Sequence, residues 1–212
     1  MSRIFRQVPA GGDRNFAYLL ADGGEAAAVD PLDPRAVLEA AREEGVKILW
    51  ILNTHGHYDH AGGNEALKKA TGAMVAAHES SPVPKDRALR HGDRIPLGDT
   101  EILVLHTPGH TEDSVCFLWE GKLLTGDTLF VGKVGGTDFG EGARREYESL
   151  HQVIGRLPGE TGIWPGHDVG LAPSSTLEKE KETNPFLLRP DFESFLDLKK
   201  NWAAYKKEHG IP

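Results

Sequence analysis

The chain has only one cysteine, Cys116, among its 212 residues, and this scarcity excludes an intrachain disulfide. Cys116 lies in an apolar stretch, residues 114–119, so we expect a buried small side chain rather than a nucleophile. No Gly-x-Ser-x-Gly segment is present either. These two absences argue against catalysis by a serine or cysteine nucleophile.

Long apolar runs and clusters of basic residues are missing as well. No stretch of ~18 apolar residues could span a bilayer, and the first residues show no basic segment followed by an apolar one. The 24 Lys and Arg are outnumbered by 32 Asp and Glu, which gives a net charge of −8. A nucleic-acid surface needs clustered basic residues. We therefore expect a cytoplasmic protein with neither a nucleic-acid nor a membrane partner. A homo-oligomer is compatible with the sequence but is not specified by it.

The length and composition fit one domain over residues 1–212. With 39% apolar residues and no Pro/Gly/Ser-rich linker, the chain can form one substantial core. Apolar segments predict strands at 17–20, 26–29, 48–52, 73–77, 101–106, 114–119, 122–125 and 162–164. Helices are predicted at 34–44, after an Asp33 cap, at 64–70 and at about 144–156. Aromatic and aliphatic residues spaced by three or four predict a C-terminal amphipathic helix over about 191–209.

What the sequence does contain is a concentration of histidine and aspartate. His55, His57, Asp59 and His60 fall within six residues, directly after the apolar strand 48–52. Alternation places the first two imidazoles on one side of an extended segment, whereas Asp59 and His60 point another way. Imidazole nitrogen and carboxylate oxygen bind borderline cations such as zinc. Because four ligands cannot complete two coordination spheres, the loop predicts a site for two metals that distant residues complete.

Three further segments supply such residues just past the ends of apolar strands. His110 follows the strand 101–106 and a Pro-Gly turn, Asp127 follows the strand 122–125, and His167 follows the strand 162–164. The strand fixes the geometry of such a residue, and the loop leaves access to it. Asp168, next to His167, is expected to be a hydrogen-bond partner of the site rather than a ligand. The other histidines match no part of the pattern: 78, 91, 106, 151 and 209.

With these motifs the chain resembles the metallo-β-lactamase superfamily. Its members share the His-x-His-x-Asp-His loop, a later His after a Pro-Gly turn, a Gly-Asp after a strand and a final Gly-His. The resemblance implies an α/β fold, the four-layer αββα sandwich. It implies two groups of metal ligands joined by a bridge: His55, His57 and His110; Asp59, His60 and His167; and Asp127 between them. Asp30, after the strand 26–29, resembles the family's supporting turn. The implied cofactors are two divalent metal ions, zinc first, with iron or manganese as alternatives.

Within the superfamily, residues 126–132, 135–139 and 182–187 are similar to those of the glyoxalase II-like hydrolases. These enzymes cleave thioesters such as S-2-hydroxyacylglutathione. The resemblance implies a metallo-hydrolase in which a water shared by two metals loses its proton and attacks the acyl carbonyl of a small-molecule thioester. Asp59 is the expected catalytic residue, because it would orient this water and take up the proton. An acyl ester, a lactone or a phosphoester is compatible with the same centre.

Two other hypotheses stay open. Residues 136–139 and 166–168 also resemble persulfide dioxygenases, in which His55, His110 and Asp127 would hold one Fe(II) with open positions for a sulfur substrate and O₂. A third hypothesis is a purely structural or binding role for the metal. Closed structural sites favour cysteine, which this cluster lacks. Loss of a structural metal would also unfold the chain, so a fold that survives metal removal would count against this hypothesis.

Overall fold

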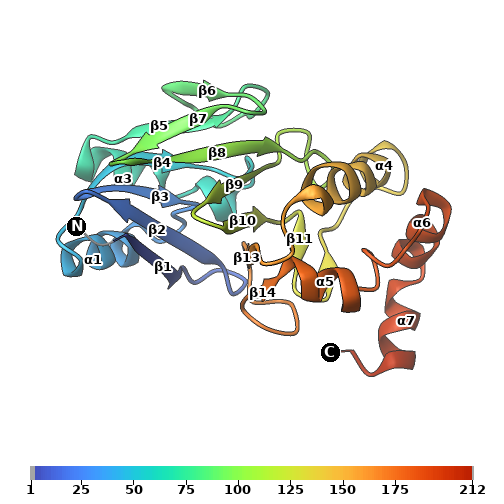
Figure 1. Ribbon diagram of the computed structural model, residues 1–212. Coiled ribbons are helices and arrows are strands. Elements are labelled where there is room, and N and C mark those ends of the chain that lie inside the picture. The colour runs from blue at the N-terminus through green and yellow to red at the C-terminus, as the bar shows by residue number, and fades with distance from the viewer. Residues whose placement is uncertain (1–2, 212) are drawn as a thin grey trace.

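The computed structural model describes residues 3–211 and contains two six-stranded sheets (Figure 1). The first sheet comes from the N-terminal half of the chain. In spatial order its strands are β1 (Ile4–Pro9), β2 (Phe16–Asp22), β3 (Glu25–Val29), β4 (Lys47–Leu52), β5 (Met74–His78) and β6 (Arg87–Leu89). The first three strands form an antiparallel meander, and β3 to β6 run parallel.

Parallel neighbours need a crossover connection, and here helices supply two of them. α1 (Pro34–Glu43) joins β3 to β4, and α2 (Tyr58–Ala61) with α3 (Asn64–Thr71) joins β4 to β5. Asp33 caps α1 as expected, because its Oδ1 accepts hydrogen bonds from the backbone of Arg35 and Ala36 at 2.9 and 3.3 Å. The histidine-rich loop therefore lies between the end of a buried strand and two helices.

The second sheet is mostly antiparallel. In spatial order its strands are β14 (Ser175–Thr176), β13 (Gly162–Pro165), β10 (Lys122–Gly126), β9 (Val115–Trp119), β8 (Thr100–His106) and β7 (Arg94–Leu97). Only β10 and β13 run parallel. The connection between these two contains the hairpin of β11 (Leu129–Phe130) and β12 (Lys133–Val134) and the helix α4 (Glu141–Glu148). The chain ends with α5 (Leu177–Thr183), α6 (Phe192–Lys200) and α7 (Trp202–His209).

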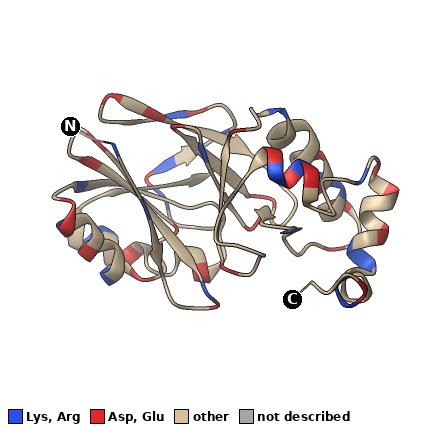
Figure 2. Cartoon of the chain, turned by 60° about the horizontal axis from the view of Figure 1, so that its bottom comes forward, with Lys and Arg blue, Asp and Glu red and all other residues tan. Residues whose placement is uncertain are grey.

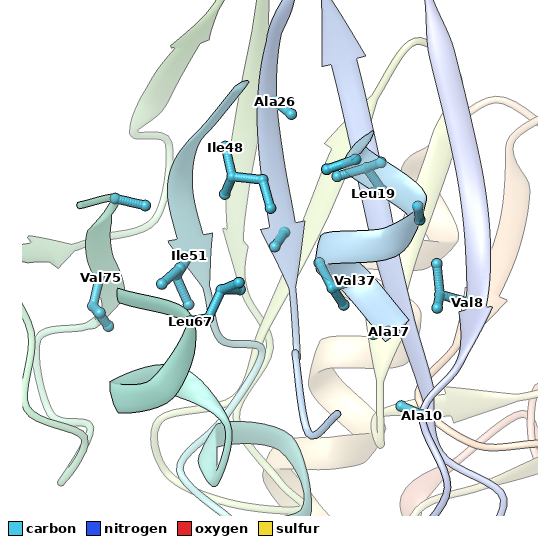
Figure 3. Packing of buried hydrophobic residues seen from close by; sticks show 14 of the residues in the cluster. Val8, Ala10, Ala17, Leu19, Ala26, Val37, Ile48, Ile51, Leu67 and Val75 are labelled. Carbon is cyan, nitrogen blue, oxygen red and sulfur yellow. The ribbon is translucent and has the colours of Figure 1, made fainter. Parts of the chain in front are cut away.

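Alternation along the strands divides the core into layers. In β2, Leu19 belongs to the cluster under α1 and α3, whereas Tyr18 and Leu20 face the second sheet. All of β2 is buried, as expected for a strand covered on both faces. Figure 3 shows the outer cluster, where Val37 of α1 and Leu67 of α3 pack on the first sheet. Two sheets lie between helices on both outer sides.

The second sheet is divided in the same way. Phe117 and Trp119 of β9 lie in the core between the sheets, whereas Cys116 joins the cluster that includes Leu177 of α5 and Phe195 of α6. Burial raises the pKa of the Cys116 thiol to about 12, so the cysteine is a small core residue, as predicted. The four-layer αββα sandwich is confirmed.

Charged residues lie mainly on the helices and loops, where basic and acidic positions are interspersed, while the strands are mostly uncharged (Figure 2). This distribution matches a structure whose sheets are covered on both sides. Among residues 3–211, no helix combines the length and the apolar character needed to cross a membrane.

The C-terminal region differs from the prediction of one helix over 191–209. The backbone of Asn201 leaves the helical conformation, with φ −104° and ψ 13°, and separates α6 from α7. The Asn201 side chain closes the end of α6 by donating to the carbonyl oxygen of Asp197 at 3.0 Å. α6 buries Phe195 and Leu198, whereas α7 buries no residue.

The predicted helix at 144–156 also needs correction. α4 begins at Glu141 and ends at Glu148, after which the backbone widens into a π-helical segment, Ser149–Val153, and a 3₁₀ turn, Ile154–Arg156. The prediction missed β1, β6, β7, β11, β12, β14, α2 and α5. Most of these strands are very short, and the six-residue β1 is an edge strand with four half-buried residues and no clear alternation.

We expect Phe195→Ala to lower the free energy of unfolding of the metal-free protein by about 3–5 kcal/mol, because it leaves a cavity under α6. Chemical denaturation followed by circular dichroism measures this change. Tyr205→Ala, on α7, is the matched control and should cost about 1 kcal/mol. Equal losses in the two variants would show that α6 and α7 contribute alike to the core.

Candidate metal centre

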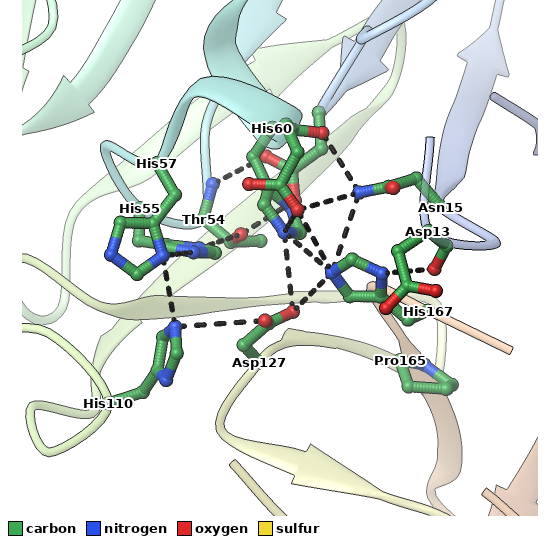
Figure 4. A network of polar contacts seen from close by, with 12 residues as sticks. Asp13, Asn15, Thr54, His55, His57, His60, His110, Asp127, Pro165 and His167 are labelled. Atoms are coloured by element: carbon green, nitrogen blue, oxygen red, sulfur yellow. Dashed lines mark hydrogen bonds and ion pairs between the residues drawn. The ribbon is translucent and has the colours of Figure 1, made fainter. Parts of the chain in front are cut away.

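The seven predicted ligand side chains converge at one edge of the two sheets (Figure 4). They follow the C-terminal ends of four strands, one in the first sheet and three in the second. The loop after β4 carries His55, His57, Asp59 and His60, and the segments after β8, β10 and β13 carry His110, Asp127 and His167.

The first group consists of His55, His57 and His110. Nδ1 of His57 lies 3.0 Å from Nε2 of His55 and 3.1 Å from Nε2 of His110. The ligand atoms of all three residues lie within 4.8 Å of one another. This spacing allows the three nitrogens to bind a single cation.

The second group consists of Asp59, His60 and His167. Nε2 of His60 lies 3.1 Å from Nε2 of His167. Oδ2 of Asp59 lies 3.6 and 3.4 Å from these two nitrogens. The group therefore offers two nitrogens and one oxygen to a second point in space, again within 4.8 Å of one another.

Asp127 lies between the two groups. Its Oδ1 is 3.3 Å from Nε2 of His60 and 3.4 Å from Nε2 of His167, whereas its Oδ2 is 3.7 Å from Nε2 of His110. Although Oδ1 is buried, it has no hydrogen bond of good geometry. The ligand atoms of each group therefore surround a common point and do not point at one another. A donor set of imidazole and carboxylate in this arrangement fits two adjacent divalent cations.

Comparison with known proteins agrees with the fold. The model of the metallo-beta-lactamase superfamily matches residues 10–167. The chain belongs to this superfamily.

Several members of the superfamily are similar to this chain over most of its length. A hydroxyacylglutathione hydrolase of Anaeromyxobacter dehalogenans is 40% identical over 83% of this chain and 82% of its own length. A cytoplasmic hydroxyacylglutathione hydrolase of Arabidopsis thaliana is 35% identical over 87% and 89% of the two chains. Among solved structures, ETHE1 from Myxococcus xanthus aligns with a TM-score of 0.87 at 33% identity, covering 94% of this chain and 91% of its own. The resemblance to glyoxalase II-like hydrolases is thus confirmed.

Asp30 supports the second group, as its likeness to the superfamily's supporting turn predicts. Its Oδ2 lies 3.0 Å from Nδ1 of His60 and accepts a hydrogen bond from Oγ1 of Thr54 at 2.6 Å, and its Oδ1 accepts from the Thr54 backbone at 2.8 Å. Asp30 adopts a φ of 50°, a conformation that costs roughly 1–2 kcal/mol for a non-glycine residue. These bonds offset the strain and turn Nε2 of His60 toward Asp127.

Asn15 is a site residue that the sequence did not reveal. Its Nδ2 donates to the carbonyl oxygen of Asp59 at 2.9 Å and to Oδ2 of the same residue at 3.2 Å. The preceding loop also holds His167, whose Nδ1 lies 2.9 Å from the carbonyl oxygen of Asp13. An isolated β-bridge between Asn15 and His167 joins these contacts. The N-terminal loop therefore orients two of the three residues of the second group.

Asp168 does not play the part predicted for it. Its side chain is exposed, and the contact that fixes this residue is a backbone hydrogen bond to the carbonyl oxygen of Arg14, at 2.9 Å. Because His167 points inward from its strand end, the next side chain points outward. Asn15 and Asp13 occupy the supporting position instead.

The charges of the two groups differ. Burial, together with the charge of His60, lowers the pKa of His55 well below its usual range, and burial also lowers the pKa of His110. Burial would lower the pKa of His60 too, but the Asp30 and Asp127 carboxylates outweigh it and raise that pKa to about 10. Without a metal, His55 and His110 are neutral, whereas His60 holds a proton that a cation must displace.

Asp127 is kept ionised by its neighbours. Burial alone would raise the pKa of its carboxyl, but the adjacent His167 and His60 rings hold the pKa well below its usual range. The centre therefore carries a permanent negative charge at the point where the two groups meet.

The centre is most exposed at His57 and Asp59. His55, His60 and His167 are buried, whereas His57 is exposed and the Asp59 side chain is 42% exposed. Gly56 and Tyr58, the neighbours of His57 in the chain, line a cavity of about 620 Å³ that also includes residues 82–86. A cavity of this size accepts a small molecule.

In the metal-free protein we expect His60 to keep its proton up to about pH 10. A raised pKa stabilises the fold fully below the unfolded value of about 6.5, and this contribution is lost as the pH rises through 10. Asp30→Asn removes one of the two carboxylate charges that raise the pKa of His60 while tolerating the positive φ, so it should lower this pKa and reduce the contribution, with Asp127 retaining part of it.

A nuclear magnetic resonance titration of the histidine ring nitrogens, with chelator present, measures this change. The exposed Asp99→Asn variant is the control and should leave the titration unchanged. A wild-type His60 that titrates near 6.5 would disprove the assignment.

Proposed function

We propose that the protein is a metallo-hydrolase that cleaves a small-molecule thioester, using two divalent metal ions, zinc first. One ion would be held by His55, His57 and His110, the other by Asp59, His60 and His167, with Asp127 bridging. The observation that carries this proposal is the placement of Asp127, whose two carboxylate oxygens face different groups at 3.3–3.7 Å. The similarity to hydroxyacylglutathione hydrolases supports the reaction.

Bound there, the two ions would supply a water that is acidic near neutral pH and would polarise an acyl carbonyl. The residues of the chain orient the reactants and move the proton. Asp59 is half-exposed, at the solvent side of the centre, and Asn15 holds its Oδ2 by a hydrogen bond of 3.2 Å. We propose that Asp59 orients the attacking water and takes up its proton.

The thiolate leaving group of a thioester needs no general acid from the protein. A thiol has a pKa of about 8.5, so a thiolate departs without a dedicated acid. The buried imidazoles of His55 and His60 exclude bulk water from one side of the centre, so substrate reaches it from the exposed side of His57 and Asp59. This arrangement suits a thioester better than an ester, whose alkoxide leaves with more difficulty.

Basic side chains near the centre support an anionic substrate such as a glutathione thioester. Lys133 of β12 places its ammonium 5.4 Å from the ring centroid of Phe130, and that ring meets His167 edge to face at 6.1 Å. Burial lowers the pKa of Lys133, and the neighbouring charges of Lys206 and Arg14 lower it further. An anion bound beside these three cations would relieve their mutual repulsion.

The segment 182–187, which includes Asn184, holds the backbone of Lys133 in position. Nδ2 of Asn184 donates to the carbonyl oxygens of Phe130 and Lys133, each at 3.4 Å, and to Oε2 of Glu180 at 2.9 Å. Oε2 of Glu180 in turn accepts from the backbone of Gly132 at 2.9 Å. The segment resembling glyoxalase II-like hydrolases therefore braces the hairpin of β11 and β12.

We also propose a cytoplasmic location, supported by the name of the Arabidopsis relative.

Elemental analysis of protein purified without oxygen and without added metal tests the proposal. We expect about two divalent ions per chain, mainly zinc, together with hydrolysis of a glutathione thioester. About one iron, with oxygen uptake on a persulfide and no thioesterase activity, would contradict the proposal and favour the persulfide dioxygenase that residues 136–139 and 166–168 leave as the second candidate.

Asp127→Ala should reduce thioester hydrolysis to the background rate, because both ions lose a shared ligand, while the circular dichroism spectrum stays that of the wild type. The exposed Asp99→Ala variant is the matched control and should keep full activity. Turnover retained by Asp127→Ala would contradict both metal-dependent reactions.

Lys133→Met should raise KM for a carboxylate-bearing thioester about tenfold, the loss expected for one charge-assisted contact of about 1.4 kcal/mol. We expect kcat to stay unchanged, because Lys133 is placed to bind rather than to react. Steady-state kinetics with a neutral thioester of similar size is the control. An equal rise of KM for both substrates would show that Lys133 does not recognise the anion.

A further inference from the structure

A buried ion pair lies behind the metal centre. Nζ of Lys199, on α6, donates a hydrogen bond to Oε2 of Glu146, on α4. The Lys199 side chain is 5% exposed, and that of Glu146 is fully buried. A buried pair of this kind is often no more stabilising than two apolar residues of the same volume. Stability alone therefore does not account for these two charges in the core.

The Lys199 ammonium has a second partner, on the connection that follows the hairpin of β11 and β12. Nζ donates to the carbonyl oxygen of Gly135 at 2.8 Å. Gly135 packs so tightly that a Cβ there would lie 1.9 Å from the carbonyl oxygen of Asp127 and 3.4 Å from Oε1 of Glu146. The ion pair thus holds the chain that presses on the backbone of Asp127.

The next residue makes a contact with the first ligand group. The carbonyl oxygen of Gly136 lies 2.7 Å from Nδ1 of His110. This contact turns Nε2 of His110 toward Nδ1 of His57, 3.1 Å away, and toward Oδ2 of Asp127, 3.7 Å away. Metal-binding histidines take their tautomer and ring orientation from such a partner.

Glu146 also touches the turn that carries His110. A Cβ on Gly109 would lie 2.5 Å from Cα of Glu146, so only glycine allows this turn to lie against α4. Just beyond α4, Oγ of Ser149 donates to the carbonyl oxygen of Pro108 at 2.8 Å. The turn before His110 is therefore fixed from the same side as the Gly135–Gly136 segment.

We propose that Lys199 and Glu146 are positioning residues for the metal centre. Through Gly135 and Gly136 they hold Asp127 and His110 where the first ligand group can bind its ion. The inference rests on the part of the proposed function that assigns metal ions to this centre. The second group is supported from other elements, by Asp30, Asn15 and Asp13, so the pair acts mainly on one of the two ions.

Zinc affinity of the full chain, measured by competition with a chromophoric chelator, tests this role. Lys199→Met removes the donor to Gly135 and leaves Glu146 buried without its partner. Lys199→Met combined with Glu146→Met removes both charges while nearly keeping the volume. Lys200→Met, at the exposed neighbouring lysine, is the matched control.

We expect both Lys199 variants to bind one of the two zinc ions about 10- to 100-fold more weakly than the wild type, the range typical for loss of a residue that orients a ligand. The control should bind as the wild type does. The thermal midpoint of the metal-free double variant should be close to the wild-type value, because two apolar residues replace the pair without an unpaired charge.

Wild-type affinity in the double variant would overturn the inference, because the pair would then serve only to neutralise buried charge. Weakened zinc binding by the variants of a protein that hydrolyses no thioester would support the inference and contradict only the proposed reaction. Failure of the wild-type protein to bind zinc would overturn both.

Discussion

The Asp127 carboxylate is the constraint on which the rest of the centre depends. Only 13% of its side chain is exposed, and it faces His60 and His167 with one oxygen and His110 with the other. A carboxylate away from water is costly without a compensating charge. The six other ligand side chains surround Asp127, so apolar side chains cannot pack there. The two sheets must therefore bring their strand ends together with enough accuracy for cations to bind between them. The layered core, apolar on both faces of each sheet, supplies this rigidity.

The seven side chains at the centre could be predicted from the sequence because their chemistry and their position coincide. Each is a histidine or aspartate, and each stands just after an apolar strand that the pattern identifies. Asn15 could not be found in this way, since asparagine is common in loops and its role depends on Asp59, 44 residues away in the chain. Lys199 stands on the apolar stripe of the amphipathic helix, four residues after Phe195 and three before Trp202, but periodicity does not show that Glu146 would be its partner.

The boundaries of helices illustrate the same limit. Apolar residues recur every three or four positions on both sides of Asn201, and this spacing predicts one helix where the chain forms α6 and α7. The break depends on a hydrogen bond from the Asn201 side chain to the carbonyl oxygen of Asp197. The spacing of apolar residues carries no information about this bond. In contrast, the Asp33 cap of α1 could be predicted, because an aspartate before a proline carries its own signal for a helix start.

The supports of the two ligand groups come from different parts of the chain, and this division has a physical consequence. Asp30, Asn15 and Asp13 precede the histidine-rich loop and fix the second group, whereas the segment at Gly135 and Gly136, braced by α4 and α6, fixes His110. Only Asp127 belongs to both. A change in the C-terminal helices reaches the second group through the Asp127 carboxylate and through the Phe130 ring against His167. A change at Asp30 reaches the first group through Thr54, whose Oγ1 lies 3.1 Å from Nδ1 of His55. His60 holds a proton that a cation must displace, whereas the pKa values of His55 and His110 are lowered. The two groups are therefore expected to bind their ions in separate steps, the group of His55 and His110 first.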